Sequence, residues 1–140
     1  MTFHPWRHLR DHHPDWTVIW AALPGGLLGR TLHDLRVIVL HNGLTQAARR
    51  STLAHELEHI TRGPTPPISA LAAKEETAID RTVARRLIDL VHLGEALAWS
   101  SLHVEVADEL WVDHDTLTAR LHTLNDAERA YLHARLEHLL

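Results

Sequence analysis

The chain contains no cysteine, and this absence excludes disulfide bonds and any cysteine-ligated zinc site. A long apolar run is also missing, because the longest stretch, residues 16–28, is short for a membrane span and is interrupted at 24–26 by Pro-Gly-Gly. A signal-peptide pattern is not seen near the N-terminus, where Arg7, Arg10 and Asp11 interrupt the sequence. We therefore expect a soluble, cytoplasmic protein that does not engage a membrane.

Basic runs are missing as well, and the formal net charge is −4 with neutral histidines. Residues 104–124 loosely follow the apolar spacing of a helix-turn-helix, with Trp111 at the turn. A DNA-binding helix needs Arg or Lys to neutralise phosphates, whereas this segment offers Asp113, Asp115 and only Arg120. Direct nucleic-acid binding is therefore disfavoured, and we expect a packed helical bundle that could dock a protein partner.

Histidine is abundant, with 14 residues, and one group of histidines has a spacing that dictates chemistry. Residues 55–59 read H-E-L-E-H, so His55 and His59 lie one turn apart on the same face of a helix and can reach one metal ion. Glu56 projects beside that face, where it can serve as a general base toward a metal-activated water. A His-rich chain can produce this motif by chance, so its context must decide.

The helix that carries the motif is predicted over residues 46–61, with Thr45 as its N-cap and a Gly-Pro pair at 63–64 ending it. Its apolar residues fall on the side opposite the two histidines, as expected for a metal-binding helix packed against a domain. Glu58, inside the motif, is expected to be a solvent-facing spacer.

A second helix is predicted over residues 71–91, with one apolar stripe at helical spacing. Glu76 and Asp80 lie in the middle of this stripe, and Glu75 lies on the other side. Burying two carboxylates one turn apart is costly unless a cation faces them. We therefore interpret Glu76 as the third metal ligand and Asp80 as the acceptor of a ligand histidine's N–H hydrogen bond.

Together these motifs resemble the ImmA/IrrE-type zinc metallopeptidases, gluzincin-like enzymes with small actinobacterial and phage members. The resemblance covers residues 16–138 and is most specific over 49–62 and 74–88, where the second segment contains K-E-E-T-A-I-D-R-T-V-A-R-R-L. It implies a Zn²⁺-dependent peptidase that cleaves a helix-turn-helix repressor protein. Carried over by position, it implies His55, His59 and Glu76 as ligands and Glu56 as base. Alignment on Ala78 would instead favour Glu75 as the ligand.

Two other functions are open from the residues alone. A non-catalytic, metal-stabilised protein that binds a repressor would not need Glu56, and a DNA-binding regulator would need a basic face. The residue that stabilises the oxyanion is not assigned; His41, His92 and Tyr131 are candidates if the fold brings them near.

The expected fold class is α+β, with a zincin-like core over residues 1–100 and a C-terminal helical segment over residues 101–140 packed on it. Strands are predicted at 16–21 and 35–40 in a small sheet of about three strands that packs on the two metal-site helices. Residues 36–40 are the candidate edge strand for pairing with substrate backbone. Residues 1–15 are polar and rich in His and Pro, and we expect them to be loosely ordered at the tip.

Overall fold

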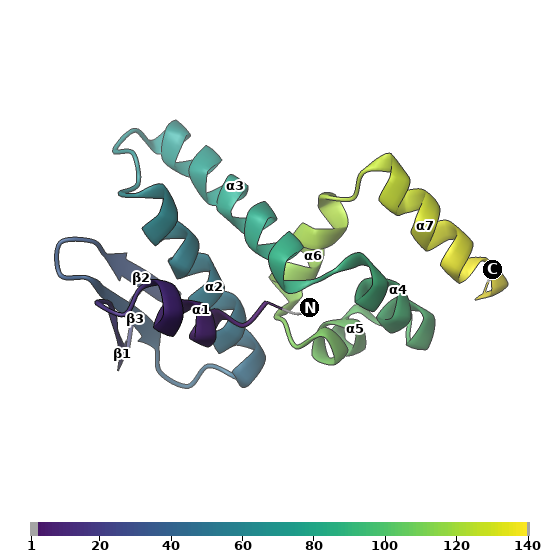
Figure 1. Cartoon of the computed structure of the whole chain (residues 1–140), viewed down its shortest axis with the longest axis horizontal. Helices are drawn as coiled ribbons and strands as arrows, with labels where there is room; N and C mark the ends of the chain where they lie inside the picture. Colours follow the sequence, from purple (N-terminus) through teal and green to yellow (C-terminus); the bar gives the residue numbers. More distant parts are fainter. Residues whose placement is uncertain (1–2, 140) are drawn as a thin grey trace.

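A small mixed sheet and two long helices form one end of the molecule, and shorter helices form the other (Figure 1). The structure, a computed structural model, describes residues 3–139, and it confirms the predicted α+β fold class. In chain order the elements are α1 (Pro5–His12), β1 (Thr17–Ala21), β2 (Gly29–Leu32), β3 (Val37–His41), α2 (Gln46–Arg62), α3 (Ser69–Leu87), α4 (Leu90–Trp99), α5 (His103–Leu110), α6 (His114–His122), α7 (Asp126–Leu136) and the 3₁₀ turn η1 (Glu137–Leu139).

The strand order is β1-β3-β2, in which β1 runs parallel to β3 and β2 runs antiparallel to it. The prediction that residues 36–40 form an edge strand is therefore wrong, because β3 is the central strand. Its apolar run fits this position, since Ile38 and Leu40 are fully buried and both edges of the strand are paired. Arg36 lies in the preceding turn with φ 51°, so the strand begins one residue later. The edge strand that contacts α2 is β2.

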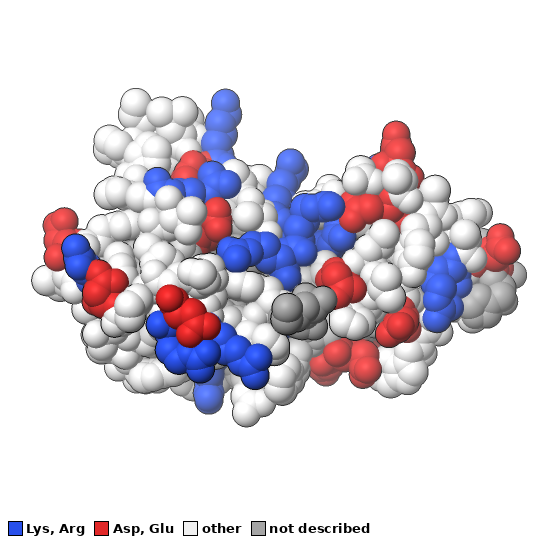
Figure 2. Space-filling model, viewed as in Figure 1, with Lys and Arg blue, Asp and Glu red and all other residues white. Residues whose placement is uncertain are grey.

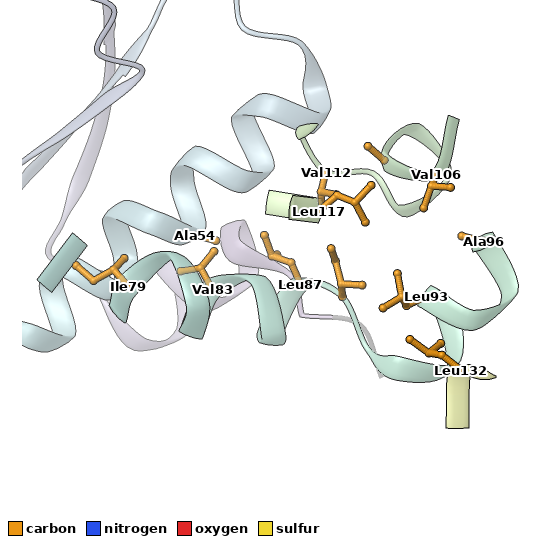
Figure 3. Close-up of a cluster of buried hydrophobic side chains, with 12 residues drawn as sticks. Ala54, Ile79, Val83, Leu87, Leu93, Ala96, Val106, Val112, Leu117 and Leu132 are labelled. Atoms are coloured by element: carbon orange, nitrogen blue, oxygen red, sulfur yellow. The ribbon is translucent and has the colours of Figure 1, made fainter. Parts of the chain in front are cut away.

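Helix α2 lies between two hydrophobic clusters and contributes to both. Its residues Leu53 and Leu57 pack with Ile38 and Leu40 of β3 and with Leu9 of α1. The other cluster joins α2 and α3 to the C-terminal helices, as Figure 3 shows. Its buried members are Ala54, Ile79, Val83, Leu87, Ile88, Leu93, Ala96, Val106, Ala107, Val112, Leu117 and Leu132. Because α2 is held on two sides, its remaining face has a fixed orientation.

The N-terminal segment is described from Phe3 onward and forms helix α1, whereas the expectation of a loosely ordered tip falls on residues 1 and 2, which lie outside the described residues. Pro5 occupies the first turn of α1, where its fixed φ and missing N–H favour helix initiation. Pro5 and Leu9 are buried, and α1 packs on α2. The apolar residues at positions 5 and 9 thus anchor an otherwise polar helix.

The predicted helix 71–91 is also corrected, because it is two helices. Helix α3 ends at Leu87, and Ile88 is buried in an extended conformation. Asp89 then caps α4 by accepting a hydrogen bond from the His92 backbone N–H at 2.8 Å. The apolar stripe continues through this break only in part, since Val91 is 52% exposed.

The segment resembling a helix-turn-helix forms α5 and α6, which pack into the second cluster. Arg120 is buried and donates to the Ile88 carbonyl (2.8 Å) and to Glu128 of α7 (2.8 Å). Hydrogen bonds from Arg85 and Arg120 lower the pKa of Glu128 to about 2. Arg120, the one arginine of this segment, therefore has a structural role inside the helical bundle.

Among the described helices, none combines the length and apolar character that crossing a membrane requires.

Candidate metal centre

Two imidazoles come from one face of α2. The helix begins at the Thr45 cap, whose hydroxyl accepts the Ala48 N–H, and it ends at Gly63, whose φ is 83°. Between these ends His55 and His59 are one turn apart, with ring centroids separated by 5.0 Å. The helix predicted over 46–61 is thus confirmed to within one residue.

Helix α3 brings a carboxylate to the same two rings. Glu76 Oε2 lies 2.8 Å from His55 Nε2, and Glu76 Oε1 lies 2.8 Å from His59 Nε2. The ligand atoms of these three residues all lie within 4.8 Å of one another. Two imidazole nitrogens and one carboxylate oxygen are a donor set that zinc accepts, and three protein ligands leave a position for water or substrate. The residues therefore fit a divalent metal ion.

Asp80 contacts the opposite nitrogen of one of these rings. Its Oδ1 is 3.0 Å from His55 Nδ1, while His55 Nε2 faces Glu76. A carboxylate in this position fixes the ring orientation and the tautomer that leaves Nε2 unprotonated for a metal. The side chains of Glu76 and Asp80 are 44% and 57% exposed, so the premise that both are buried is wrong. Their part of α3 faces an open cleft.

The two remaining glutamates of these helices form salt bridges outside the group of His55, His59 and Glu76. Glu75 lies 3.3 Å from Arg62, so it points away from the histidines. Glu58 lies 3.1 Å from Arg62 and 3.8 Å from Arg86, and only 7% of the residue is exposed. The expectation of a solvent-facing Glu58 is wrong, because the arginine that ends α2 and one from α3 cover it.

The protonation of His55 reflects its carboxylate neighbours. Burial lowers the pKa of His55, but the Asp80 hydrogen bond and the charges of Glu56, Glu76 and Asp80 outweigh burial and raise it to about 9. The ring is therefore an imidazolium at neutral pH when no metal is bound. A metal ion would have to displace this proton, since a histidine ligand binds through an unprotonated nitrogen.

Glu56 is held by the edge strand β2. Thr31 donates its hydroxyl hydrogen to Glu56 Oε2 at 2.6 Å. Gly29, two residues earlier on the same strand face, lies so close that an added Cβ would be 2.7 Å from the Thr52 side chain and 3.1 Å from that of Glu56. Burial raises the pKa of Glu56, and the Thr31 hydrogen bond and the two histidines oppose that rise. A carboxyl with a raised pKa suits general-base work near neutral pH.

Sequence reasoning missed both Gly29 and Thr31. A usable signal existed in residues 29–32, where a glycine and a threonine alternate with longer side chains at the period of a strand. Assigning that strand to the site nevertheless required its position beside α2.

These residues line a cleft with a volume of about 670 Å³, bounded by β2, α2, α3 and α6. Its walls also carry Arg30, His33, Asp113 and Asp115. His41, His92 and Tyr131, the suggested oxyanion-stabilising residues, do not line it. His41 Nδ1 instead accepts the Leu23 backbone N–H at 3.0 Å. A larger cavity of about 780 Å³ elsewhere shares no lining residue with the cleft and contains none of the three converging ligands.

The Peptidase_M78 family model, which describes the IrrE N-terminal-like domain, matches residues 22–138. This match covers most of the chain, including both metal-site helices and the edge strand, and the chain belongs to this family. Membership supports a metallopeptidase-type function. No curated protein and no solved structure gives a significant match to the chain.

Proposed function

We propose that the protein is a zinc-dependent endopeptidase whose substrate is a helix-turn-helix repressor. The observation that carries the proposal is the convergence of His55 and His59 from α2 with Glu76 from α3, beside the buried Glu56. A zinc ion held by the three ligands would supply Lewis acidity toward the scissile carbonyl and lower the pKa of a water molecule.

Glu56 acts as the general base in this proposal. It takes a proton from the attacking water and passes it to the departing amine. Thr31 acts as a positioning residue, because its hydroxyl donates a hydrogen bond to Glu56 Oε2. This bond fixes the rotation of the carboxylate about its last side-chain bond. Asp80 holds the His55 ring, and the carboxylate–imidazole contact keeps the metal-facing nitrogen in place.

The open edge of β2 is suited to pair with an extended peptide. Among the described residues, strand β2 pairs with β3 on one side and with no strand on the other, and Gly29, Arg30 and Thr31 line the cleft. Backbone pairing at a sheet edge gives affinity with little sequence preference, and the neighbouring side chains supply selectivity. A peptide bond placed along this strand would pass the Glu56 carboxylate.

Co-expression with a helix-turn-helix repressor chosen as the test substrate tests the reaction. Glu56→Gln keeps the shape of the side chain and can still accept the Thr31 hydrogen bond, but it cannot take a proton. The variant should retain metal and fold while cleavage falls by about 10²-fold or more. Equal loss of the repressor with wild type and variant would refute hydrolysis by Glu56, and intact repressor that co-purifies with both forms would indicate a binding protein.

A further inference from the structure

Four of the five tryptophans line the larger cavity, away from the candidate metal centre. Trp6 comes from α1, Trp20 from β1, Trp99 from the end of α4, and Trp111 follows α5. The volume of about 780 Å³ falls within the range of small-ligand pockets, roughly 300–1,000 Å³. The two halves of the molecule meet at this cavity, with α1 and α2 on one side and α4 and α5 on the other (Figure 1).

The indole rings leave much apolar surface in water. Trp6 and Trp20 are 44% and 45% exposed and stack on each other, while Trp99 and Trp111 are 62% and 60% exposed. None of these four rings belongs to either hydrophobic cluster. A concentration of exposed aromatic surface in one concavity marks a binding site more often than a packing feature.

Trp111 also has an unfavourable backbone conformation. Its φ of 60° is left-handed, which costs a bulky residue on the order of 1–3 kcal/mol unless its surroundings hold it. Arg50 supplies such support, since its guanidinium donates to the Leu110 and Trp111 carbonyls at 3.3 and 3.0 Å. This strained turn presents the indole to the cavity instead of to the core.

Charges of opposite sign stand on the two sides of the cavity. Arg7 and Arg49 come from α1 and α2, and Glu95 and Glu109 come from α4 and α5. Within the part of the chain that the structure describes, none of these four side chains forms a salt bridge. Figure 2 shows mainly basic side chains over α1 and the nearby end of α2, with an acidic group among them on α1, and acidic side chains over α5. A ligand that complements these walls carries a negative and a positive group separated by an apolar body.

We propose that this cavity binds a short apolar peptide with free termini, roughly two to four residues long. The peptide carboxylate pairs with Arg7 and Arg49, and the ammonium group pairs with Glu95 and Glu109. Apolar side chains between the ends cover the exposed indoles. The proposal does not depend on the peptidase function, because the two cavities share no lining residue.

Binding of trileucine to the full chain tests this site, with tryptophan fluorescence and calorimetry as readouts. Free trileucine should bind saturably, and trileucine with an acetylated N-terminus and an amidated C-terminus should bind at least about tenfold more weakly, because both charge-assisted contacts are lost. The double variant Arg7→Gln, Arg49→Gln should weaken free trileucine by about tenfold or more. Arg129→Gln, an exposed arginine on α7 outside the cavity, is the matched control and should bind as wild type does.

Several results would overturn the proposal. Equal affinity for the free and capped peptides would show that the charged walls have no role. The absence of saturable binding at millimolar trileucine would exclude this ligand class. A fluorescence change that depends on protein concentration alone, together with a dimer in sedimentation, would show that the indoles contact a second copy of the chain.

Discussion

The metal-free protein should lose stability as the pH rises from about 6.5 to about 9, because His55 binds its proton more tightly in the folded chain. Burial alone would lower the pKa of this ring. The Asp80 hydrogen bond and the charges of Glu56, Glu76 and Asp80 raise it from 6.5 to about 9. The unfolded chain lacks these neighbours, so its ring releases the proton near pH 6.5.

The size of the effect follows from the difference between the two pKa values. One pKa unit corresponds to about 1.4 kcal/mol, so a ring with a pKa raised from 6.5 to about 9 stabilises the fold by roughly 3 kcal/mol. Because the folded-state pKa is the higher one, this contribution is fully present below pH 6.5. It declines through the interval and is absent above about pH 9. The side chain is 22% exposed, so solvent screens the interaction only in part.

Urea unfolding of chelator-treated protein at intervals across this pH range measures the effect. His55→Gln is the matched control, because its stability should change less with pH over the same interval. Zinc affinity should instead rise with pH, since the metal displaces the imidazolium proton. A wild-type stability that is flat or increases across the interval, with the same slope in His55→Gln, would refute the assigned electrostatics.

Substitutions at four further residues test the site. Glu76→Ala should abolish stoichiometric zinc binding, whereas Glu75→Ala should retain it; the opposite pattern in metal analysis would make Glu75 the ligand. Asp80→Ala should weaken zinc affinity by about 10–100-fold, and an unchanged affinity would leave Asp80 with no role at the metal. Thr31→Val should lower kcat by about 10–100-fold, because a hydrogen bond to a charged group is worth about 1.5–3 kcal/mol, with KM and zinc content nearly unchanged. Thr31→Ser should restore kcat, and equal rates in wild type and Thr31→Val would show that Glu56 needs no such support.

The helical part of the site was predictable because its information is local. The spacing of His55 and His59 places both on one face of a helix, and the Thr45 cap and Gly63 limit that helix. Glu76 was identified as a candidate metal ligand from its position on an apolar stripe. The argument was incomplete because it assumed that the carboxylate is buried. The carboxylates of Glu76 and Asp80 were expected to be buried and compensated by a cation, but they line an open cleft instead.

Predictions failed where ion pairs or helix caps, and not the apolar periodicity, decide the environment of a residue. Glu58 is covered by Arg62 on the same helix and by Arg86 on the next helix. The spacing of apolar residues along α2 does not predict this burial. The break after Leu87 depends on Asp89 capping α4 while Ile88 stays buried. A continuous apolar periodicity concealed that break.

The sheet shows why Glu56, the proposed general base, could be identified from the sequence while its contact with Thr31 could not. Glu56 follows from the motif, but its orientation depends on Thr31, a residue 25 positions earlier. That contact requires β2 to be the strand beside α2, which requires β3 to be central and β2 to pair with it in the observed register. A shift of one residue would turn Thr31 to the opposite face and bring Arg30 or Leu32 toward Glu56. The close approach at Gly29 admits no such longer side chain, so the same packing that fixes the register also places the hydroxyl on the carboxylate.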